Sequence, residues 1–223
     1  MNGVDARPHF LELFAGTKSI GKVASTFEFG YDVTSVDIDA TCEPTICCDI
    51  LEWEYTKFPV GYFDIIWASP PCATFSNLRC SWIGREMTRS HPGTTFTRDM
   101  MIYDEKSIGL VLLRHTLIII DYFKPKFFFV ENPLTGRMKN YMYDLPYADV
   151  CYCEYGFDYK KPTRIWTNCG TFIHGGNARM CTHIRHARSI GKKHNLTLQQ
   201  KYSIPPELVR TCLLATRSFI TAA

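Results

Sequence analysis

Short apolar segments that alternate with helical segments are the feature that most constrains the fold of this 223-residue chain. Each apolar segment is rich in β-branched and aromatic residues and is bounded by turn residues, which predicts buried strands. The predicted strands are 9–14, 31–36, 46–49, 63–68, 126–130, 150–155 and 164–167, and the predicted helices are 18–27, 105–123 and 207–219. This alternation predicts an α/β fold with a mostly parallel, doubly wound sheet and one late antiparallel strand.

Composition limits the class of protein. Hydrophobic residues make up 46% of the chain and charged residues 21%, which excludes a disordered or fibrous protein. The longest apolar stretches are too short, or too interrupted by charge, to cross a bilayer, and the first residues lack the apolar core of a secretion signal. We therefore expect an intracellular protein that is not secreted and whose ten cysteines are thiols.

Residues that carry chemistry follow the predicted strands directly. Ligands of an open parallel sheet bind beyond the carboxyl ends of its strands, where Gly16, Asp37, Asp49, Cys72 and Glu131 all fall. Gly16 allows a tight turn before a helix whose free N–H groups attract negative charge. An acid at the position of Asp37 is the usual partner of ribose hydroxyls, although a surface acid after any such strand is the alternative. The pattern favours a cofactor that contains a nucleoside.

Cys72 and Glu131 suggest the reaction. Cys72 follows two prolines that cannot continue a strand, so its thiol is expected to be held rigidly at the sheet edge; a structural buried cysteine is the alternative. Glu131 follows an apolar strand, where burial favours a protonated carboxyl that can donate a hydrogen bond. A thiol beside a proton donor predicts nucleophilic attack on a ring that protonation makes electrophilic.

Six segments, in this order, resemble the cytosine carbon-5 DNA methyltransferases: LELFAGTKSIG, VDID, CDIL, FDIIWASPPCATFS, KPKFFFVENP and KPTRIWTN. The resemblance spans about residues 8–168 and is greatest to the short forms of large DNA viruses and phages. The P-C-x-x-F-S motif followed by the E-N pair is its most specific part. It implies a Rossmann-like methyltransferase fold and base flipping, with S-adenosylmethionine as methyl donor.

The resemblance also assigns residues. The cofactor would be held by Phe14, Ala15, Gly16, Thr17, Asp37, Ile38, Asp49, Ile50 and Pro71. Cys72 would be the nucleophile, Ser76 a helper near the cytosine, Glu131 the group that binds ring nitrogen 3, Asn132 the residue that positions the catalytic loop, and Arg164 the residue that orients the base. The implied substrate is double-stranded DNA in the cytoplasm or nucleus of a host cell, with no membrane and no obligate protein partner.

Basic residues are concentrated late in the chain, although the net charge is only +3. No acidic residue occurs between Tyr159 and Pro206, which predicts a surface for phosphates; a solvated basic face is the alternative. We expect DNA contacts from a lid at 77–91 and from this basic stretch, through Arg79, Arg85, Arg89, Arg179, Arg185, Arg188, Lys192 and Lys193. The expected organisation is a catalytic domain at 1–168, a recognition segment at 169–200 and a C-terminal helix within 201–223 that packs back on the domain.

Cys169, Cys181, His183 and His186 suggest a zinc site at first sight. Their spacing matches no common zinc finger, so we expect core thiols, phosphate-facing histidines and no metal.

The chain departs from the family pattern at Ala73, Pro133 and Pro162, and in its glycine-rich turn. The family's C-terminal motif that closes the cofactor pocket is not found, and the predicted helix 207–219 is the candidate to replace it. Three alternatives remain open: a catalytically silent DNA-binding protein of the same fold, a tRNA-directed cytosine methyltransferase, and an exocyclic-amine methyltransferase, whose S-P-P motif continues with an aromatic residue where this chain has Cys72.

Overall fold

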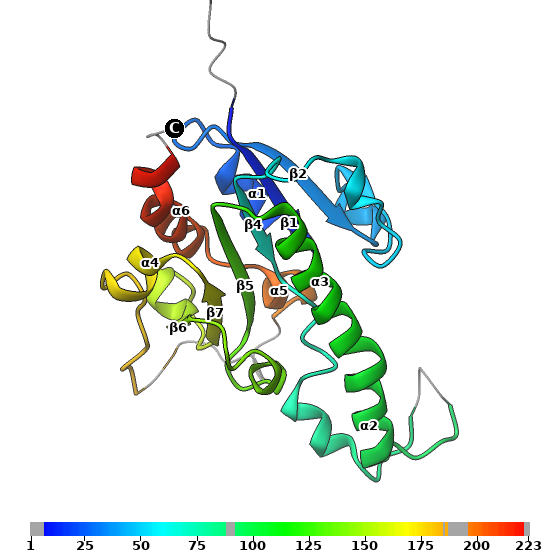
Figure 1. The fold of residues 1–223 in the computed structure, drawn as a ribbon. Helices are drawn as coiled ribbons and strands as arrows, with labels where there is room; N and C mark the ends of the chain where they lie inside the picture. The colour runs from blue at the N-terminus through cyan, green and yellow to red at the C-terminus, as the bar shows by residue number, and fades with distance from the viewer. Residues whose placement is uncertain (1–6, 88–91, 185, 187–195, 221–223) are drawn as a thin grey trace, which may run out of the picture.

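A seven-stranded sheet forms the centre of the computed structural model, which describes residues 7–87, 92–184, 186 and 196–220 (Figure 1). The strands are β1 (His9–Leu13), β2 (Asp32–Asp37), β3 (Ile46–Cys47), β4 (Ile65–Ala68), β5 (Phe127–Pro133), β6 (Tyr147–Cys151) and β7 (Pro162–Thr167). Their order in the sheet is β3-β2-β1-β4-β5-β7-β6. Only β7 runs antiparallel to the other strands, which confirms the predicted mostly parallel α/β fold with one late antiparallel strand.

The helices cover both faces of this sheet. They are α1 (Ser19–Ala24), α2 (Arg98–Asp104), α3 (Leu110–Phe123), α4 (Gly170–His174), α5 (Leu198–Tyr202) and α6 (Pro206–Ile220). Short helical turns are η1 (Ala40–Cys42), η2 (Tyr55–Lys57), η3 (Asn77–Trp82), η4 (Glu105–Gly109), η5 (Met138–Tyr141) and η6 (Tyr152–Tyr155). No helix among the described residues has both the length and the apolar character that crossing a bilayer requires.

Side chains alternate between the two faces along each strand, as a pleated backbone requires. Phe10 and Ile65 pack toward α1, α4 and α6, whereas Leu11 and Ile66 pack toward α3. Both faces of the central strands are therefore buried, which explains why their sequences read as continuous apolar runs. In α6, Leu208, Val209, Cys212 and Leu213 form the apolar stripe that packs against the first of these faces.

Three predicted elements differ from the structure. The predicted strand 150–155 is replaced by β6, which ends at Cys151, and by the turn η6. The polar segment 77–106, whose glycines and proline favour a loop, contains η3 and α2, and α2, η4 and α3 form one continuous rod that extends beyond the sheet (Figure 1). Strand β5 continues through Glu131 and Asn132 to Pro133, because the antiparallel partner β7 pairs with it up to Thr163. The proline suggested an earlier end, but pairing with β7 carries the strand into the site.

Candidate active site

A pocket of about 830 Å³ opens at the carboxyl ends of β1, β2, β4 and β5. All nine residues that the sequence assigned to the cofactor line it: Phe14, Ala15, Gly16, Thr17, Asp37, Ile38, Asp49, Ile50 and Pro71. Cys72 and Glu131 line the same pocket. The site thus combines a cofactor-sized hollow with a thiol and a carboxyl at one end of the sheet.

The turn after β1 ties the ends of two strands together. Phe14 and Gly16 both have left-handed backbone conformations, with φ of 59° and 46°. The Gly16 N–H donates to Asp37 Oδ2 over 2.8 Å, and the Asp39 N–H donates to Asp37 Oδ1 over 2.8 Å. A left-handed conformation costs a residue such as Phe14 roughly 1–2 kcal/mol, and such strain is concentrated at ligand sites.

Glu12 is a buried acid in the pocket wall that the sequence analysis did not single out. Its side chain is 3% exposed and accepts hydrogen bonds from the N–H groups of Ile20, over 3.1 Å, and Gly21, over 3.0 Å. Burial raises the pKa of Glu12 to about 7, against the opposing effect of these two bonds and of Lys18 and Lys22. Glu12 therefore caps the start of α1 from within the sheet.

Replacing Glu12 by glutamine is expected to change how stability depends on pH. A folded-state pKa raised from 4.5 to about 7 means that the wild type has no ionisation penalty below pH 4.5 and the full penalty above pH 7. As the pH rises through this window, the free energy of unfolding of the wild type should therefore fall by on the order of 3 kcal/mol relative to that of Glu12→Gln. Urea unfolding of both proteins at pH values below, within and above the window measures the difference, and a constant difference would contradict the raised pKa.

Cys72 lies in a short loop after β4 that the neighbouring strand holds in place. Asn132 Nδ2 donates to the Pro70 carbonyl oxygen over 2.9 Å, and the Phe75 N–H donates to the Cys72 carbonyl oxygen over 3.2 Å. Burial and the charge of Glu131 raise the pKa of Cys72, and Lys161 partly offsets them. The thiol is thus held in position but not ionised in the free protein at neutral pH.

Tyr152 and Lys161 complete the site, and the sequence analysis missed both. Tyr152 Oη donates to Glu131 Oε1 over 2.8 Å, and both side chains are buried. Burial and Glu131 keep the pKa of Tyr152 well above its usual value, so the hydroxyl remains a donor. Lys161 lines the pocket, and its ammonium group lies 4.5 Å from the Tyr152 ring centre and donates to the Lys201 carbonyl oxygen over 3.0 Å.

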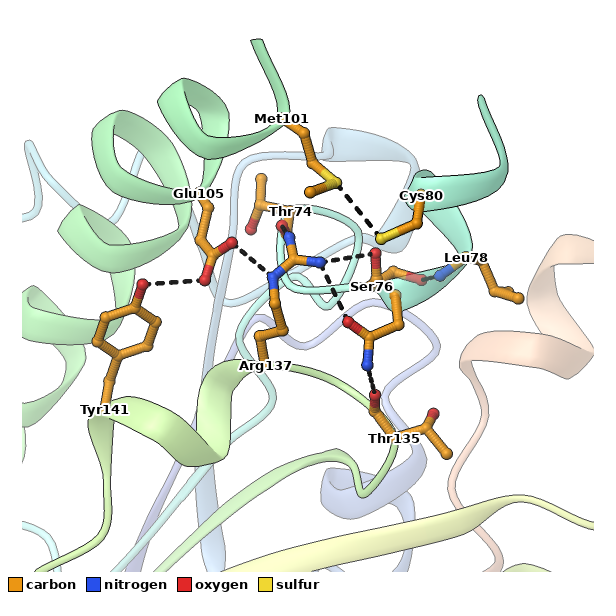
Figure 2. A network of polar contacts seen from close by, with 10 residues as sticks. Thr74, Ser76, Leu78, Cys80, Met101, Glu105, Thr135, Arg137 and Tyr141 are labelled. Carbon is orange, nitrogen blue, oxygen red and sulfur yellow. Dashed lines mark hydrogen bonds and ion pairs between the residues drawn. The ribbon is translucent and has the colours of Figure 1, made fainter. Parts of the chain in front are cut away.

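Arg137 holds the backbone that follows Cys72 (Figure 2). Its guanidinium donates to Glu105 Oε2 over 2.6 Å and to the carbonyl oxygens of Thr74, over 3.2 Å, and Ser76, over 3.5 Å. Tyr141 Oη donates to the other oxygen of Glu105 over 2.9 Å. Because Glu105 belongs to η4, this buried ion pair joins residues 72–76, the expected catalytic loop, to the helical rod.

The π-helical turn η4 lets the rod approach the catalytic loop closely. A Cβ atom on Gly109 would lie 2.3 Å from Thr74 Oγ1 and 3.0 Å from Phe75 Cζ, so no larger residue fits there without displacing the loop. Single π-helical turns inside α-helices are frequent at functional sites. The turn thus places Glu105 for Arg137 and Gly109 against the loop.

Three catalytic residues assigned from the sequence lie away from the pocket lining: Ser76, Asn132 and Arg164. Ser76 caps η3 by accepting from the Leu78 N–H over 3.2 Å. Arg164 makes two hydrogen bonds to Asp149, over 2.7 and 2.8 Å, and shares a face of the sheet with Asn132 rather than with Glu131. Because the guanidinium of Arg164 is bound to Asp149, this geometry does not support the expected contact between Arg164 and the cytosine.

The residues expected to contact DNA divide into three groups. Arg79 is 9% exposed, pairs with Asp104 and lies over the Phe96 ring, so its side chain is buried against the rod and this geometry does not support its predicted DNA contact. Arg85 and Arg179 are exposed. The expected contacts of Arg89, Arg185, Arg188, Lys192 and Lys193 lie outside the described residues.

Helix α5, rather than α6, forms the C-terminal wall of the pocket. Leu198, Gln199, Tyr202 and Ile204 line it, and the Ile204 N–H donates to Ser19 Oγ over 3.1 Å. The expectation that the helix at 207–219 covers the pocket is wrong, because the apolar stripe of α6 is used in packing against α1 and α4. Thr197 and Gln200 form a capping box that starts α5, a signal that was present in the sequence.

The chain is an S-adenosylmethionine-dependent methyltransferase, as its relationship to a named viral protein shows, and its mostly parallel sheet and the pocket at the strand ends fit this class. A Frog virus 3 protein named "Probable DNA (cytosine-5)-methyltransferase" is 37% identical over 216 residues, which cover 89% of this chain and 95% of that protein. The chain belongs to the DNA (cytosine-5)-methyltransferase family. No protein-family model matches it.

Solved structures of methyltransferases are similar at lower identity. The Entamoeba histolytica methyltransferase EhMeth has a TM-score of 0.49 at 13% identity, and the alignment covers 73% of this chain and 53% of that one. The METTL16 methyltransferase domain has a TM-score of 0.43 at 11% identity, covering 74% of this chain and 75% of that one.

Proposed function

We propose that this enzyme transfers a methyl group to carbon 5 of a cytosine that is flipped out of double-stranded DNA, with Cys72 as a covalent nucleophile. The supporting observation is that Cys72 and Glu131 line the same pocket as all nine expected cofactor residues. A methyltransferase that acts directly on an exocyclic amine needs no thiol at this position. The Frog virus 3 relative, whose name includes this activity, supports the same reaction.

The pocket residues fit S-adenosylmethionine. The Asp37 carboxylate, held by the turn at Gly16, is placed for ribose hydroxyls, and Ile38 and Ile50 offer apolar surfaces for an adenine. Pro71 and Cys72 line the same space, on the β4 side of the pocket. The cofactor supplies an electrophilic methyl group on a sulfonium.

The protein's own groups make carbon 5 of the cytosine nucleophilic. Cys72 gives up its thiol proton to solvent as its sulfur adds to carbon 6, and the electron pair of the 5,6 double bond becomes available at carbon 5. Glu131 binds ring nitrogen 3 and, when protonated, stabilises the charge that this addition places on the ring. After methylation, a base removes the proton from carbon 5 and Cys72 leaves, which restores the double bond. Asn132 holds the loop of Cys72 throughout through its bond to Pro70.

Loss of the Tyr152 hydroxyl is expected to reduce turnover without weakening binding. Tyr152 orients Glu131 but is not itself in the pocket lining, so it is a positioning residue. Tyr152→Phe should lower kcat about 10- to 100-fold, as small misplacements of a reacting group do, with KM for DNA nearly unchanged. Steady-state kinetics separate the two constants. Tyr122→Phe removes a comparable hydroxyl that donates to the Phe58 carbonyl far from the pocket, and an equal loss in this control would contradict the role of Tyr152.

DNA is proposed to contact the exposed cations Arg85 and Arg179, which lie outside the pocket lining. Arg85 lies after η3, and Arg179 lies beside β6, where the Cys151 N–H donates to the Arg179 carbonyl oxygen over 2.9 Å. Residues 169–200 contain most of the basic stretch that lacks acidic residues. We propose them as the recognition segment next to a catalytic domain at 1–168. Competition between duplex DNA and tRNA for methyl transfer distinguishes this substrate from the RNA alternative.

The test of the function combines product and adduct. Purified protein, S-adenosylmethionine carrying a labelled methyl group and unmethylated duplex DNA should give 5-methylcytosine when the DNA is digested to nucleosides. Duplex DNA that contains 5-fluorocytosine should form a stable covalent complex with the wild type, because fluorine blocks the loss of the carbon 5 proton, and none with Cys72→Ala. Methylation at the exocyclic amine, or DNA binding without any transfer, would overturn the proposal.

A further inference from the structure

Four potential metal ligands meet at the edge of the sheet, away from the pocket. Cys153 in η6 and Cys181, His183 and His186 after α4 present ligand atoms that all lie within 4.8 Å of one another. We propose that they bind one structural Zn²⁺ ion that fastens the start of the recognition segment to the end of β6. The proposal concerns metal binding and stands whether or not the proposed reaction is correct.

The distances match a tetrahedral zinc site. Cys181 Sγ lies 3.1 Å from His186 Nε2 and 3.5 Å from His183 Nδ1. With Zn–S near 2.3 Å and Zn–N near 2.0–2.1 Å, neighbouring sulfur and nitrogen ligands of a tetrahedron are about 3.6 Å apart. Two thiols and two imidazoles form a common donor set of structural zinc sites, and they favour Zn²⁺ over Mg²⁺ or Ca²⁺.

The surroundings also suit a thiolate ligand. The His183 N–H points at Cys181 Sγ over 3.3 Å, and such backbone donors stabilise the negative sulfur of a metal-bound cysteine. Glu154 Oε1 lies 3.2 Å from His183 Nδ1 and adds a carboxylate beside the cluster. The four residues are partly exposed, so an ion can enter from solvent.

Cys169 is not part of this cluster, although it is the cysteine that the sequence pattern groups with the other three. Its side chain is fully buried, and its Sγ lies 3.7 Å from the Ala215 carbonyl oxygen in the core beneath α6. Cys153 takes its place from the turn after β6, far upstream in the chain. Sequence spacing alone therefore groups Cys169 with residues that it does not meet and omits Cys153.

A zinc ion here would fasten together two parts of the chain that already touch through the Glu154–His183 ion pair. One part is η6, whose Tyr152 holds Glu131, and the other is the segment that follows Arg179. Because two thiolates neutralise the charge of Zn²⁺, the ion would add no net charge beside the basic stretch. Its role would be to order the segment.

Metal content of the full-length protein tests the inference. Protein purified under reducing conditions and dialysed without strong chelator should contain about one Zn²⁺ per chain by elemental mass spectrometry. Co²⁺ in its place should give the strong visible absorption of a tetrahedral site with thiolate ligands. The variants Cys153→Ser and His186→Gln should lose most of the metal, whereas the exposed controls Cys47→Ser and His174→Gln should keep it.

If a variant fails to fold, the zinc content and the Co²⁺ spectrum of the wild type still test the inference. Wild-type protein that neither contains zinc nor gives a tetrahedral Co²⁺ spectrum would overturn it, and so would a disulfide between Cys153 and Cys181 in the reduced preparation. Equal zinc content in Cys153→Ser and Cys47→Ser would place the metal elsewhere and would equally overturn it.

Discussion

Replacing Cys72 by alanine or serine is expected to lower kcat for methyl transfer by at least about 10⁴-fold, since the main reacting group is lost. A serine hydroxyl at this position would be ionised far less than the thiol, whose pKa burial and Glu131 already raise. Affinity for S-adenosylmethionine should change little, because the other lining residues of the pocket remain. Single-turnover methylation and calorimetric cofactor binding measure the two effects.

The matched control for this substitution is Cys47→Ser. Cys47 is an exposed thiol on β3 outside the pocket lining, and its loss should leave the rate of methylation unchanged. Methylation by Cys72→Ser at the rate of the wild type would refute the covalent route and would favour direct transfer to an amine.

Arg137→Met is expected to produce a large loss of stability, of about 3–5 kcal/mol, because it leaves the Glu105 carboxylate buried without its partner. The same change also removes the donors that hold the carbonyl oxygens of Thr74 and Ser76 (Figure 2). The free energy of unfolding from urea titrations measures the effect. Arg137→Lys should recover only part of it, since one ammonium group cannot reach all of these acceptors.

Arg210→Met is the matched control for the buried pair. Arg210 makes two hydrogen bonds to Glu28, over 3.0 and 2.8 Å, but this pair is exposed at the surface between α6 and the end of α1. Exposed pairs of this kind contribute far less to stability than buried ones, because solvent screens them. A loss for Arg137→Met as small as that for Arg210→Met would show that the network in Figure 2 does not support the catalytic loop.

The cofactor side of the pocket could be predicted from the sequence because local signals mark it. The strands β1 and β4 are apolar runs, and a glycine, an acid or a cysteine lies at or within four residues of the carboxyl ends of β1, β2 and β4, a known place for ligands in a parallel sheet. Gly16, Asp37 and Cys72 therefore came together as expected. The same signals do not reveal which residues of other elements reach that end of the sheet.

The missed residues depend on register and on contacts between distant segments. Arg164 and Ile165 are neighbours in sequence, but only pairing with β5 decides that Ile165 shares the face of Glu131. Tyr152 and Lys161 reach Glu131 and the pocket because β6 and β7 form a hairpin beside β5. Cys153 reaches the histidines because η6, which carries it, directly follows β6 at the edge of the sheet.

The place of α5 in the pocket wall lets one ligand join elements that are far apart in the sequence. Leu198, Gln199 and Tyr202 line the same hollow as the turn after β1, and the Ile204 N–H donates to Ser19 Oγ. A molecule that fills this hollow therefore contacts both α5 and the turn before α1, so its binding free energy adds to the stability of the folded state. Hydrogen exchange in α5 should accordingly slow when the pocket is filled.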